Sequence, residues 1–251
     1  VKQINPGNLV IVKQEKLQII PYFTWKPWII NKVRNNYLKD LKALNNRIIK
    51  KLIKSANGKQ IIIPLSGGLD SRFLAAGLKK HGYNNVICVS YGIEGNKEVK
   101  IAKEVCKKLE YKWLYIKYTS KLFKEAFYSK DYIKYLNYCD NFTAIHFPGE
   151  YLMLKNLKKN KMIDENAIIV NGQTGDFISG NHIPLSLHNT NFRKNNIASR
   201  LELLTKEYIN KHYKHWKSIM NDDNKEIIKS YISMALKKMG GFSQNWENDF
   251  G

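Results

Sequence analysis

The chain is poor in cysteine, and its cysteines lack the spacing of metal-binding pairs. Its three cysteines, Cys88, Cys106 and Cys139, lie far apart, and none belongs to a CxxC motif. This spacing gives no zinc-ribbon or iron–sulfur ligand set. An odd count also gives no disulfide framework. The cysteine usage therefore favours a reducing compartment, and we expect the protein to be cytoplasmic.

Long apolar stretches and acidic residues are scarce as well. No apolar run reaches the roughly 20 residues that a transmembrane helix needs, so the sequence predicts no membrane partner. The 42 lysines and arginines outnumber the 21 acidic residues and give a formal net charge of +21. Such a balance suits a polyanionic partner such as nucleic acid. Because the lysines are spread along the whole chain among asparagines and isoleucines, the charge also fits a biased overall composition.

The sequence has no initial methionine and no signal-peptide pattern, so we expect a piece of a longer chain. Residues 1–28 are predicted to contain a β-hairpin, with strands at Leu9–Val12 and Leu17–Ile20 on either side of a polar turn. Residues 29–251 are predicted to form one larger domain. A chain of 251 residues with 43% hydrophobic residues can fill such a core.

Short apolar strands alternate with amphipathic helices in the larger domain. The predicted strands are Ile61–Leu65, Val86–Tyr91, Trp113–Tyr118 and Ala167–Asn171. A long helix is expected first, with one apolar face made of Val33, Tyr37, Leu41, Leu44, Ile48 and Leu52. Two more amphipathic helices are expected within Leu201–Met239. This alternation predicts an α/β fold with a parallel, doubly wound sheet, in which ligands bind beyond the carboxyl ends of the strands.

The most specific motif is a glycine turn, Ser66–Ser71, which follows an apolar strand and leads into a helix. Gly67 and Gly68 have no side chains, so backbone N–H groups can approach phosphate oxygens at the start of that helix. The Ser66 hydroxyl can donate to such an oxygen. The turn is not a Walker A loop, because no Gly-Lys-Ser/Thr follows it.

Two residues of this turn, Ser71 and Asp70, have side chains that could take part in binding phosphate. Ser71 is expected to cap the following helix and to donate to phosphate. Asp70 would repel a bare phosphate, so a function for it requires Mg²⁺ as a bridge. A plain strand–turn–helix is the structural alternative, and the complete six-residue string favours the nucleotide site over it.

The string Ser66-Gly67-Gly68-Leu69-Asp70-Ser71 resembles the pyrophosphate loop of the ATP pyrophosphatase superfamily. Its context resembles the synthetase domain of the asparagine synthetase family over roughly residues 30 to 190. Val89–Gly92 stands where that family holds adenine and ribose with backbone groups. Glu98 resembles the acidic residue at the head of the family's next helix. Asn171–Asp176 resembles the family's SGEGSDE turn.

The second turn is expected to face the same crevice as the first. Asp70 and Asp176 each lie in a glycine turn that follows a strand, and the carboxyl ends of parallel strands meet at one edge. In relatives this turn supplies a second magnesium-binding aspartate, which Asp176 matches. The alternative for Asp176 is a turn aspartate that bonds its own backbone.

The resemblance implies an ATP-dependent, AMP-forming amide ligase that resembles asparagine synthetase. A substrate carboxylate would attack the α-phosphorus of ATP and release pyrophosphate, and ammonia would then displace AMP from the acyl-adenylate. The resemblance implies two catalytic residues, Asp70 and Gln173. Glu98 and His182, the latter close to the second turn, are weaker candidates for lining the substrate crevice. The expected ATP-binding residues are Leu65, Ser66, Gly67, Gly68, Asp70, Ser71, Ser90, Tyr91, Gly92 and Gly172.

One departure from the family pattern leaves the product open. Gln173 stands where relatives often carry glutamate, and glutamine cannot act as a general base at neutral pH. The acid substrate is therefore aspartate or a related acid, such as a sugar acid. Val1–Tyr22 resembles the last strands of the family's glutaminase domain, which we expect in the parent chain. Because no cysteine precedes Cys88, this chain would use free ammonia.

Two other functions stay open. An RNA-modifying member of the superfamily is favoured by the charge of +21, and the absence of CxxC argues against its thiolating branch. A domain that binds nucleotide without turnover is favoured by Gln173.

Overall fold

The computed structural model describes residues 4, 7–23, 36–139, 148–173, 175, 184–188, 196–213 and 221–238. The chain divides into two compact units, each considered by itself. The first is Arg34–Gly175, and the second consists of Lys2–Val33 and Asp176–Gly251. Among the helices in these ranges, none is long and apolar enough to cross a bilayer.

The first unit is built on a four-stranded sheet in the order β5-β4-β3-β6, and every neighbouring pair is parallel. The strands are β3 (Ile61–Pro64), β4 (Val86–Gly92), β5 (Lys112–Lys117) and β6 (Ile168–Ile169). β6 pairs with β3 on the side away from β4, so the winding of the chain reverses between β3 and β6. The predicted parallel α/β fold is confirmed, and its topological switch point lies at the carboxyl ends of these two strands.

Alternating side chains of the inner strands enter two separate cores. Ile61 and Ile63 of β3 pack on one face with Cys88, whereas Ile62 packs on the other with Val89. All five side chains are completely buried. Because both faces of β3 are covered, its sequence is continuously apolar rather than alternating.

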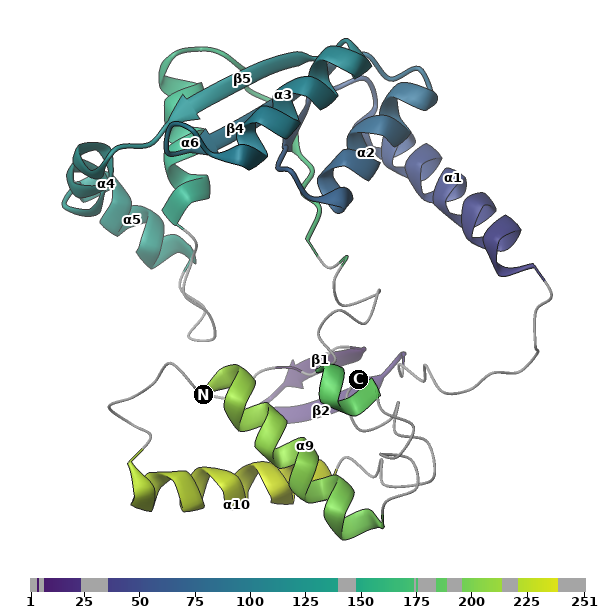
Figure 1. Ribbon diagram of the computed structural model, residues 1–251, viewed down its shortest axis with the longest axis vertical. Coiled ribbons are helices and arrows are strands. Elements are labelled where there is room, and N and C mark those ends of the chain that lie inside the picture. The colour runs from purple at the N-terminus through teal and green to yellow at the C-terminus, as the bar shows by residue number, and fades with distance from the viewer. Residues whose placement is uncertain are drawn as a thin grey trace. The chain divides into compact units, whose positions relative to one another are not determined.

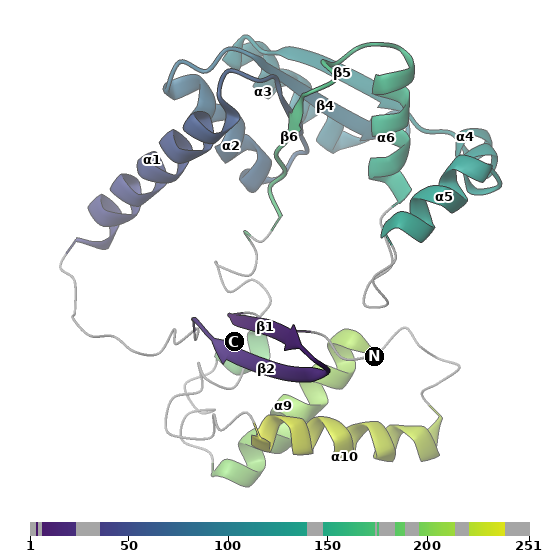
Figure 2. The same ribbon diagram turned by 180° about the vertical axis from the view of Figure 1, so that it is seen from behind.

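Helices cover both faces of the sheet (Figures 1 and 2). On the first face lie α1 (Tyr37–Ala56), α2 (Leu69–Lys80) and α3 (Lys97–Leu109). On the second face lie α4 (Ser120–Phe127) and α6 (Pro148–Lys159), with α5 (Lys130–Cys139) next to α4. The helices on the two faces confirm the doubly wound arrangement.

The helix α1 forms as predicted, but a different set of its residues is buried. Asn57 ends it in the left-handed conformation, at φ 48°. Leu41 and Leu44 of the predicted apolar face are 52% and 40% exposed, whereas Ile49 and Ala56 are buried. Both buried residues lie in the second half of the helix, which is the half that packs in the core of the first face.

Cys88 on β4 and Cys106 on α3 are neighbours in the core of the first face, and all three cysteines are free thiols. A hydrogen bond with Cys106, together with burial, raises the pKa of the Cys88 thiol well above its usual range. Cys88 is therefore a neutral, packed thiol.

The second unit contains the predicted β-hairpin and the two predicted C-terminal helices. β1 (Asn8–Lys13) pairs antiparallel with β2 (Lys16–Pro21) across Gln14 and Glu15, whose φ angles of 47° and 64° fit a tight hairpin turn. The helical part comprises the 3₁₀ turn η1 (Leu185–His188), α9 (Ile197–His212) and α10 (Asp222–Lys238). These three elements share a leucine-rich core made of Leu187, Leu201, Leu204 and Leu236. The assignment of residues 1–28 to the tail of a glutaminase domain stays a prediction.

Candidate functional site

The glycine turn begins where β3 leaves the sheet. The Leu65 N–H still donates to the Val89 carbonyl of β4, at 2.8 Å. The Ser90 hydroxyl donates to the Leu65 carbonyl at 2.8 Å, and the indole N–H of Trp113 donates to the Ser90 oxygen at 3.0 Å. Ser90 is 3% exposed, so this chain of hydrogen bonds is shielded from water. It fixes the point from which the turn starts.

The turn then folds back on itself through its two serines. The Gly68 N–H donates to the Ser66 Oγ at 3.1 Å, and the Ser66 N–H donates to the Ser71 Oγ at 3.2 Å. The expected cap by Ser71 is wrong: α2 begins at Leu69, Gly68 is its N-cap, and no side chain caps it. Ser71 lies within the first helical turn and is 5% exposed. Because no side chain occupies the cap, the first N–H groups of α2 can bind an anion.

The second glycine turn packs directly against the first. A Cβ added to Gly172 would lie 2.8 Å from the Ser71 nitrogen, and one added to Gly175 would lie 2.5 Å from the Asp70 carboxyl carbon. Contacts this close leave room only for glycine at both positions. The turns that follow β3 and β6 therefore meet at Asp70, at the switch point of the sheet.

Asp70 is the acidic residue at this meeting point. Its carboxylate is exposed and accepts no hydrogen bond and no ion pair from the parts of the chain that the structure describes. Carboxylate oxygens of this kind suit Mg²⁺. Those same parts hold no cluster of three or more His, Cys, Asp or Glu side chains. A magnesium-binding role for Asp70 stays a prediction.

A cavity of about 200 Å³ lies beside the first turn, at the carboxyl ends of β3 and β4. Glu98, in the first turn of α3, lines it and also packs against Gly67, where an added Cβ would lie 3.2 Å from the Glu98 Cα. The cavity is lined by Pro64, Leu65, Ser66, Ser90, Tyr91, Asn96, Glu98 and Val99. Five residues predicted for the site therefore share one cavity. Gly92, at the end of β4, has a φ of +143° and accepts the Tyr115 hydroxyl at 2.8 Å.

Of three further predicted site residues, the structure describes Gln173 but neither Asp176 nor His182. Gln173 is exposed, and its N–H lies 3.4 Å from the Asn171 side-chain oxygen. Asp176 and His182 lie outside the described residues. Asp176 directly follows Gly175, which packs on Asp70. Its role as a second magnesium ligand, like the roles of the other site residues, stays a prediction.

Sequence reasoning missed two residues that shape the cavity. Asn96 caps α3, and its side-chain oxygen accepts the Glu98 N–H at 2.8 Å. An asparagine directly before a helix pattern was the available signal. Trp113 reaches Ser90 from β5, where it pairs with Cys88 in the register. No sequence signal marked Trp113, because the bond depends on the order of the strands.

Replacing Trp113 by phenylalanine is expected to weaken ATP binding. The substitution keeps an aromatic ring but removes the N–H that holds Ser90. A lost hydrogen bond of this kind costs about 1 kcal/mol, so we expect the KM for ATP to rise about fivefold with kcat little changed. Steady-state kinetics measure this effect. Tyr83→Phe is the matched control, since it removes the hydrogen bond to the Lys59 carbonyl at the amino ends of the strands. Equal KM values in both variants would contradict the positioning role of Trp113.

The fold and this turn define a class: a parallel α/β domain with a glycine turn and an uncapped helix start at its switch point. A sequence model of the asparagine synthase family matches residues 58–241, well over half of the chain. The chain belongs to the asparagine synthase family. The enzymes of this family use ATP. The expectation that the chain belongs to an ATP-using family is therefore confirmed.

Solved structures with partial similarity are weak matches. The NH3-dependent NAD synthetase from Campylobacter jejuni, in complex with the nitrate ion, is 17% identical, with a TM-score of 0.39 over 56% of this chain and 58% of that one. A predicted subunit of tRNA methyltransferase from Methanocaldococcus jannaschii is 26% identical, with a TM-score of 0.28 over 46% of this chain and 53% of that one. The chain thus spans a little over half the length of these structures. No curated protein matches it.

Proposed function

We propose that the chain is an ATP-dependent, AMP-forming amide ligase domain. One observation carries the proposal: two glycine turns meet at Asp70, beside the uncapped start of α2. Phosphate oxygens bound there would accept hydrogen bonds from the first N–H groups of α2. The adjoining cavity would hold the base and ribose of ATP. Membership of the asparagine synthase family supports the same assignment.

The residues of the turn would act mainly by binding and orientation. The N–H groups at the start of α2 would hold the leaving pyrophosphate, where donors already in place stabilise developing charge. The Ser66 hydroxyl can donate to a phosphate oxygen. Asp70, with Asp176 as the proposed second ligand, would hold Mg²⁺, which supplies charge neutralisation at the phosphates. The buried Ser90 bond to Leu65 keeps the turn in register with β4.

The second substrate is proposed to be a small carboxylic acid, with ammonia as the nitrogen donor. Aspartate or a related acid fits the family. A carboxylate oxygen would attack the α-phosphorus, pyrophosphate would leave, and ammonia would displace AMP from the acyl group. Gln173 cannot take a proton from ammonia at neutral pH, so it would contribute by hydrogen bonding. A glutaminase domain elsewhere in the parent chain and a cytoplasmic location belong to the same proposal.

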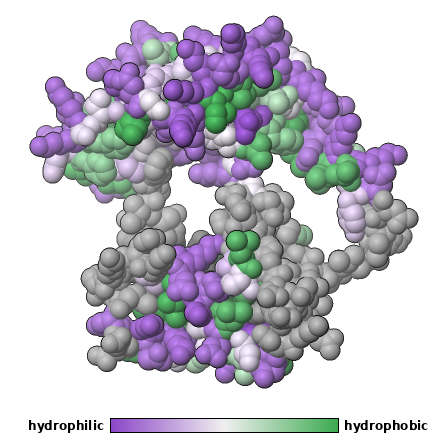
Figure 3. Space-filling view, in the orientation of Figure 1, coloured by the Kyte–Doolittle hydropathy of each residue, from purple (hydrophilic) through white to green (hydrophobic). Residues whose placement is uncertain are grey.

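An RNA-modifying reaction at the same ATP site is the second candidate, favoured by charge. Much of the face of the first unit shown in Figure 3 is hydrophilic. The helix α3 alone exposes Lys97, Lys100, Lys103, Lys107 and Lys108. A lysine-rich surface of this kind attracts phosphate backbones.

Pyrophosphate release with ATP, Mg²⁺ and ammonium separates these candidates. We expect aspartate or another small acid to stimulate release, with AMP and an amide formed in equal amounts. Stimulation by tRNA but by no small acid would replace the ligase proposal with the RNA-modifying one. ATP binding without release under any of these conditions would show a nucleotide-binding domain without turnover.

A further inference from the structure

The second half of α1 carries four cations on one side, Arg47, Lys50, Lys51 and Lys54, which we call the basic row. All four are exposed, and their spacing of three or four residues places them on one face of the helix. Together with Asn46 they line a hollow of about 420 Å³. Within the parts of the chain that the structure describes, none of the four forms an ion pair.

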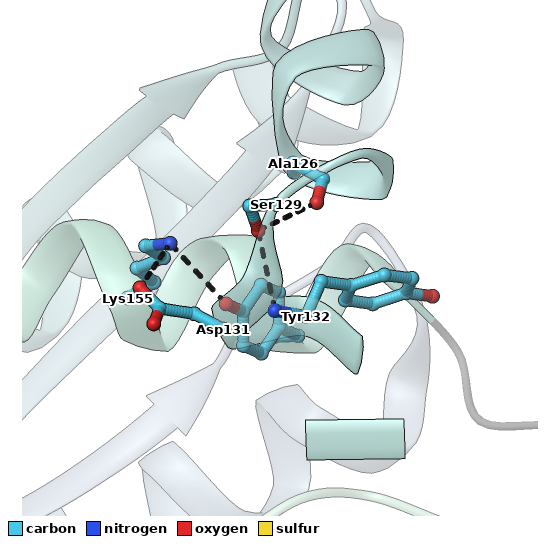
Figure 4. Close-up of polar contacts among 6 residues, drawn as sticks. Ala126, Ser129, Asp131, Tyr132 and Lys155 are labelled. Carbon is cyan, nitrogen blue, oxygen red and sulfur yellow. Dashed lines mark hydrogen bonds and ion pairs between the residues drawn. The ribbon is translucent and has the colours of Figure 1, made fainter. Parts of the chain in front are cut away.

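Several other lysines of the first unit are paired with acidic side chains. On the second face of the sheet, Lys155 donates to the Asp131 carboxylate at 3.1 Å (Figure 4). On the first face, Lys79 pairs with Glu110 at 3.2 Å. Like charges that lie side by side without such pairs repel one another, and a bound polyanion relieves that repulsion. The basic row therefore suits a partner that carries several negative charges.

The end of α2 adds a fifth cation to the basic row. The Lys80 ammonium donates to the Asn46 side-chain oxygen at 3.4 Å, and Nε2 of His81 lies 3.3 Å from the same oxygen. Because Asn46 lines the hollow of the basic row, Lys80 is held at the edge of that hollow. These charges come from two helices, so the packing of α1 on α2 brings them together.

A mainly apolar groove of about 350 Å³ adjoins the basic row, between α1 and α2, and Asn46 lines both hollows. Three apolar side chains that line the groove are exposed to solvent: Leu38 is 82% exposed, Leu41 52% and Phe73 45%. Lys80 lines it as well. Proteins bind single-stranded nucleic acids with this combination, a basic surface for the phosphates and an aromatic side chain on which a base stacks.

We propose that the basic row and the adjoining apolar groove form a binding surface for single-stranded nucleic acid. The phosphates lie along the basic row and a base stacks on Phe73. One turn of α1 rises about 5.4 Å, which is close to the spacing of successive phosphates along an extended strand. A double helix suits the surface less well, because its bases are stacked on one another and leave the apolar groove empty.

This surface is separate from the proposed ATP site. The helix α2 begins beside the glycine turn and ends at Lys80, and its 12 residues span about 18 Å. A strand on the basic row is therefore held at the far end of α2 from Asp70. The surface anchors the protein to nucleic acid rather than presenting a base for reaction, and the inference does not depend on the ligase function.

The test is the binding of a fluorescently labelled strand, measured by anisotropy over a range of KCl concentrations. RNA and DNA strands of one sequence are the two probes, and binding of either supports the proposal. In the test variant all four residues of the basic row are replaced by glutamine, which has a similar helix propensity. Each phosphate contact with a single strand contributes about 0.7 to the slope of log affinity against log salt, so we expect the slope to fall by about 3. Affinity at low salt should fall roughly tenfold or more.

Phe73→Leu tests the apolar groove separately from the charges. The substitution keeps an apolar side chain but removes the ring, so we expect affinity to fall about fivefold or more with the salt slope unchanged. Phe127→Leu is the matched control, because Phe127 is 49% exposed and lies on α4, on the other face of the sheet. Equal affinities of the two variants would remove Phe73 from the surface.

The control for the basic row loses the same four charges on the second face of the sheet. In it Lys124, Lys130, Lys134 and Lys158, which are all exposed, are replaced by glutamine. Equal losses in the two fourfold variants would overturn the proposal and assign the binding to net charge alone. A wild-type protein that binds neither strand, or one that binds anionic vesicles instead, would also overturn it. Circular dichroism should show every variant folded, and pyrophosphate release, measured in parallel, tests the ligase proposal independently.

Discussion

Asp70→Asn is expected to lower magnesium-dependent pyrophosphate release by about 100-fold or more. The substitution preserves the shape of the side chain but removes the negative charge at the meeting point of the two glycine turns. Because Asp70 receives no protein donor in the described parts of the chain, its charge is available to a metal ion. Losses of this size accompany removal of one group that stabilises charge in the transition state.

The measurement is a magnesium titration of the pyrophosphate release rate. Asp164→Asn is the control, because Asp164 is exposed at the amino edge of β6, where its backbone N–H bonds the Gln60 side chain at 2.9 Å. Both variants should fold, since an acidic residue in the first turn of α2 contributes only about 0.3–1 kcal/mol to stability. An Asp70→Asn protein with the wild-type rate and magnesium dependence would remove Asp70 from the site.

Gly175→Ala is expected to disrupt the same meeting point from the other side. The new Cβ would lie 2.5 Å from both the Asp70 carboxyl carbon and one of its oxygens. The turn or the carboxylate must therefore move. A displacement of about 1 Å in an active site can cost about 100-fold in rate, and overpacking costs about 1–3 kcal/mol in stability. We expect pyrophosphate release to fall by at least tenfold and the melting temperature to drop.

Gly82→Ala separates the effect on the site from a general loss of stability. Gly82 has a φ of +75° and open space around it, so alanine there is strained but touches nothing. It should cost about 1 kcal/mol in stability and leave turnover unchanged. If Gly175→Ala retained full activity at a temperature where both variants are folded, the close packing of the two turns would have no functional role.

The sequence alone was sufficient for the fold class, because its signals are local. The run Ile61–Ile63 is apolar on both faces, which indicates a buried parallel strand, and the turn Ser66–Ser71 directly follows it. The pair Asn57-Gly58 is a local helix-stop signal, and α1 ends there. The expected cap by Ser71 failed because glycine at the N-cap leaves no side chain to predict, and only the backbone shows where α2 begins.

Burial on α1 and the bond from Trp113 to Ser90 could not be read from the sequence. Periodicity predicts that a helix has an apolar face, but not which half of the helix reaches the sheet. Leu41 fits the pattern and is exposed, while Ile49 is buried. The Trp113 bond joins residues 23 positions apart across two strands, and it exists because β5 lies next to β4.

The sequence by itself determined the glycine turn Ser66–Ser71, the parallel α/β class and the asparagine synthase family, since these depend on short stretches of neighbouring residues. Only the tertiary structure decided that the turns after β3 and β6 meet at Asp70, because that contact joins segments about a hundred residues apart through the winding order of the sheet.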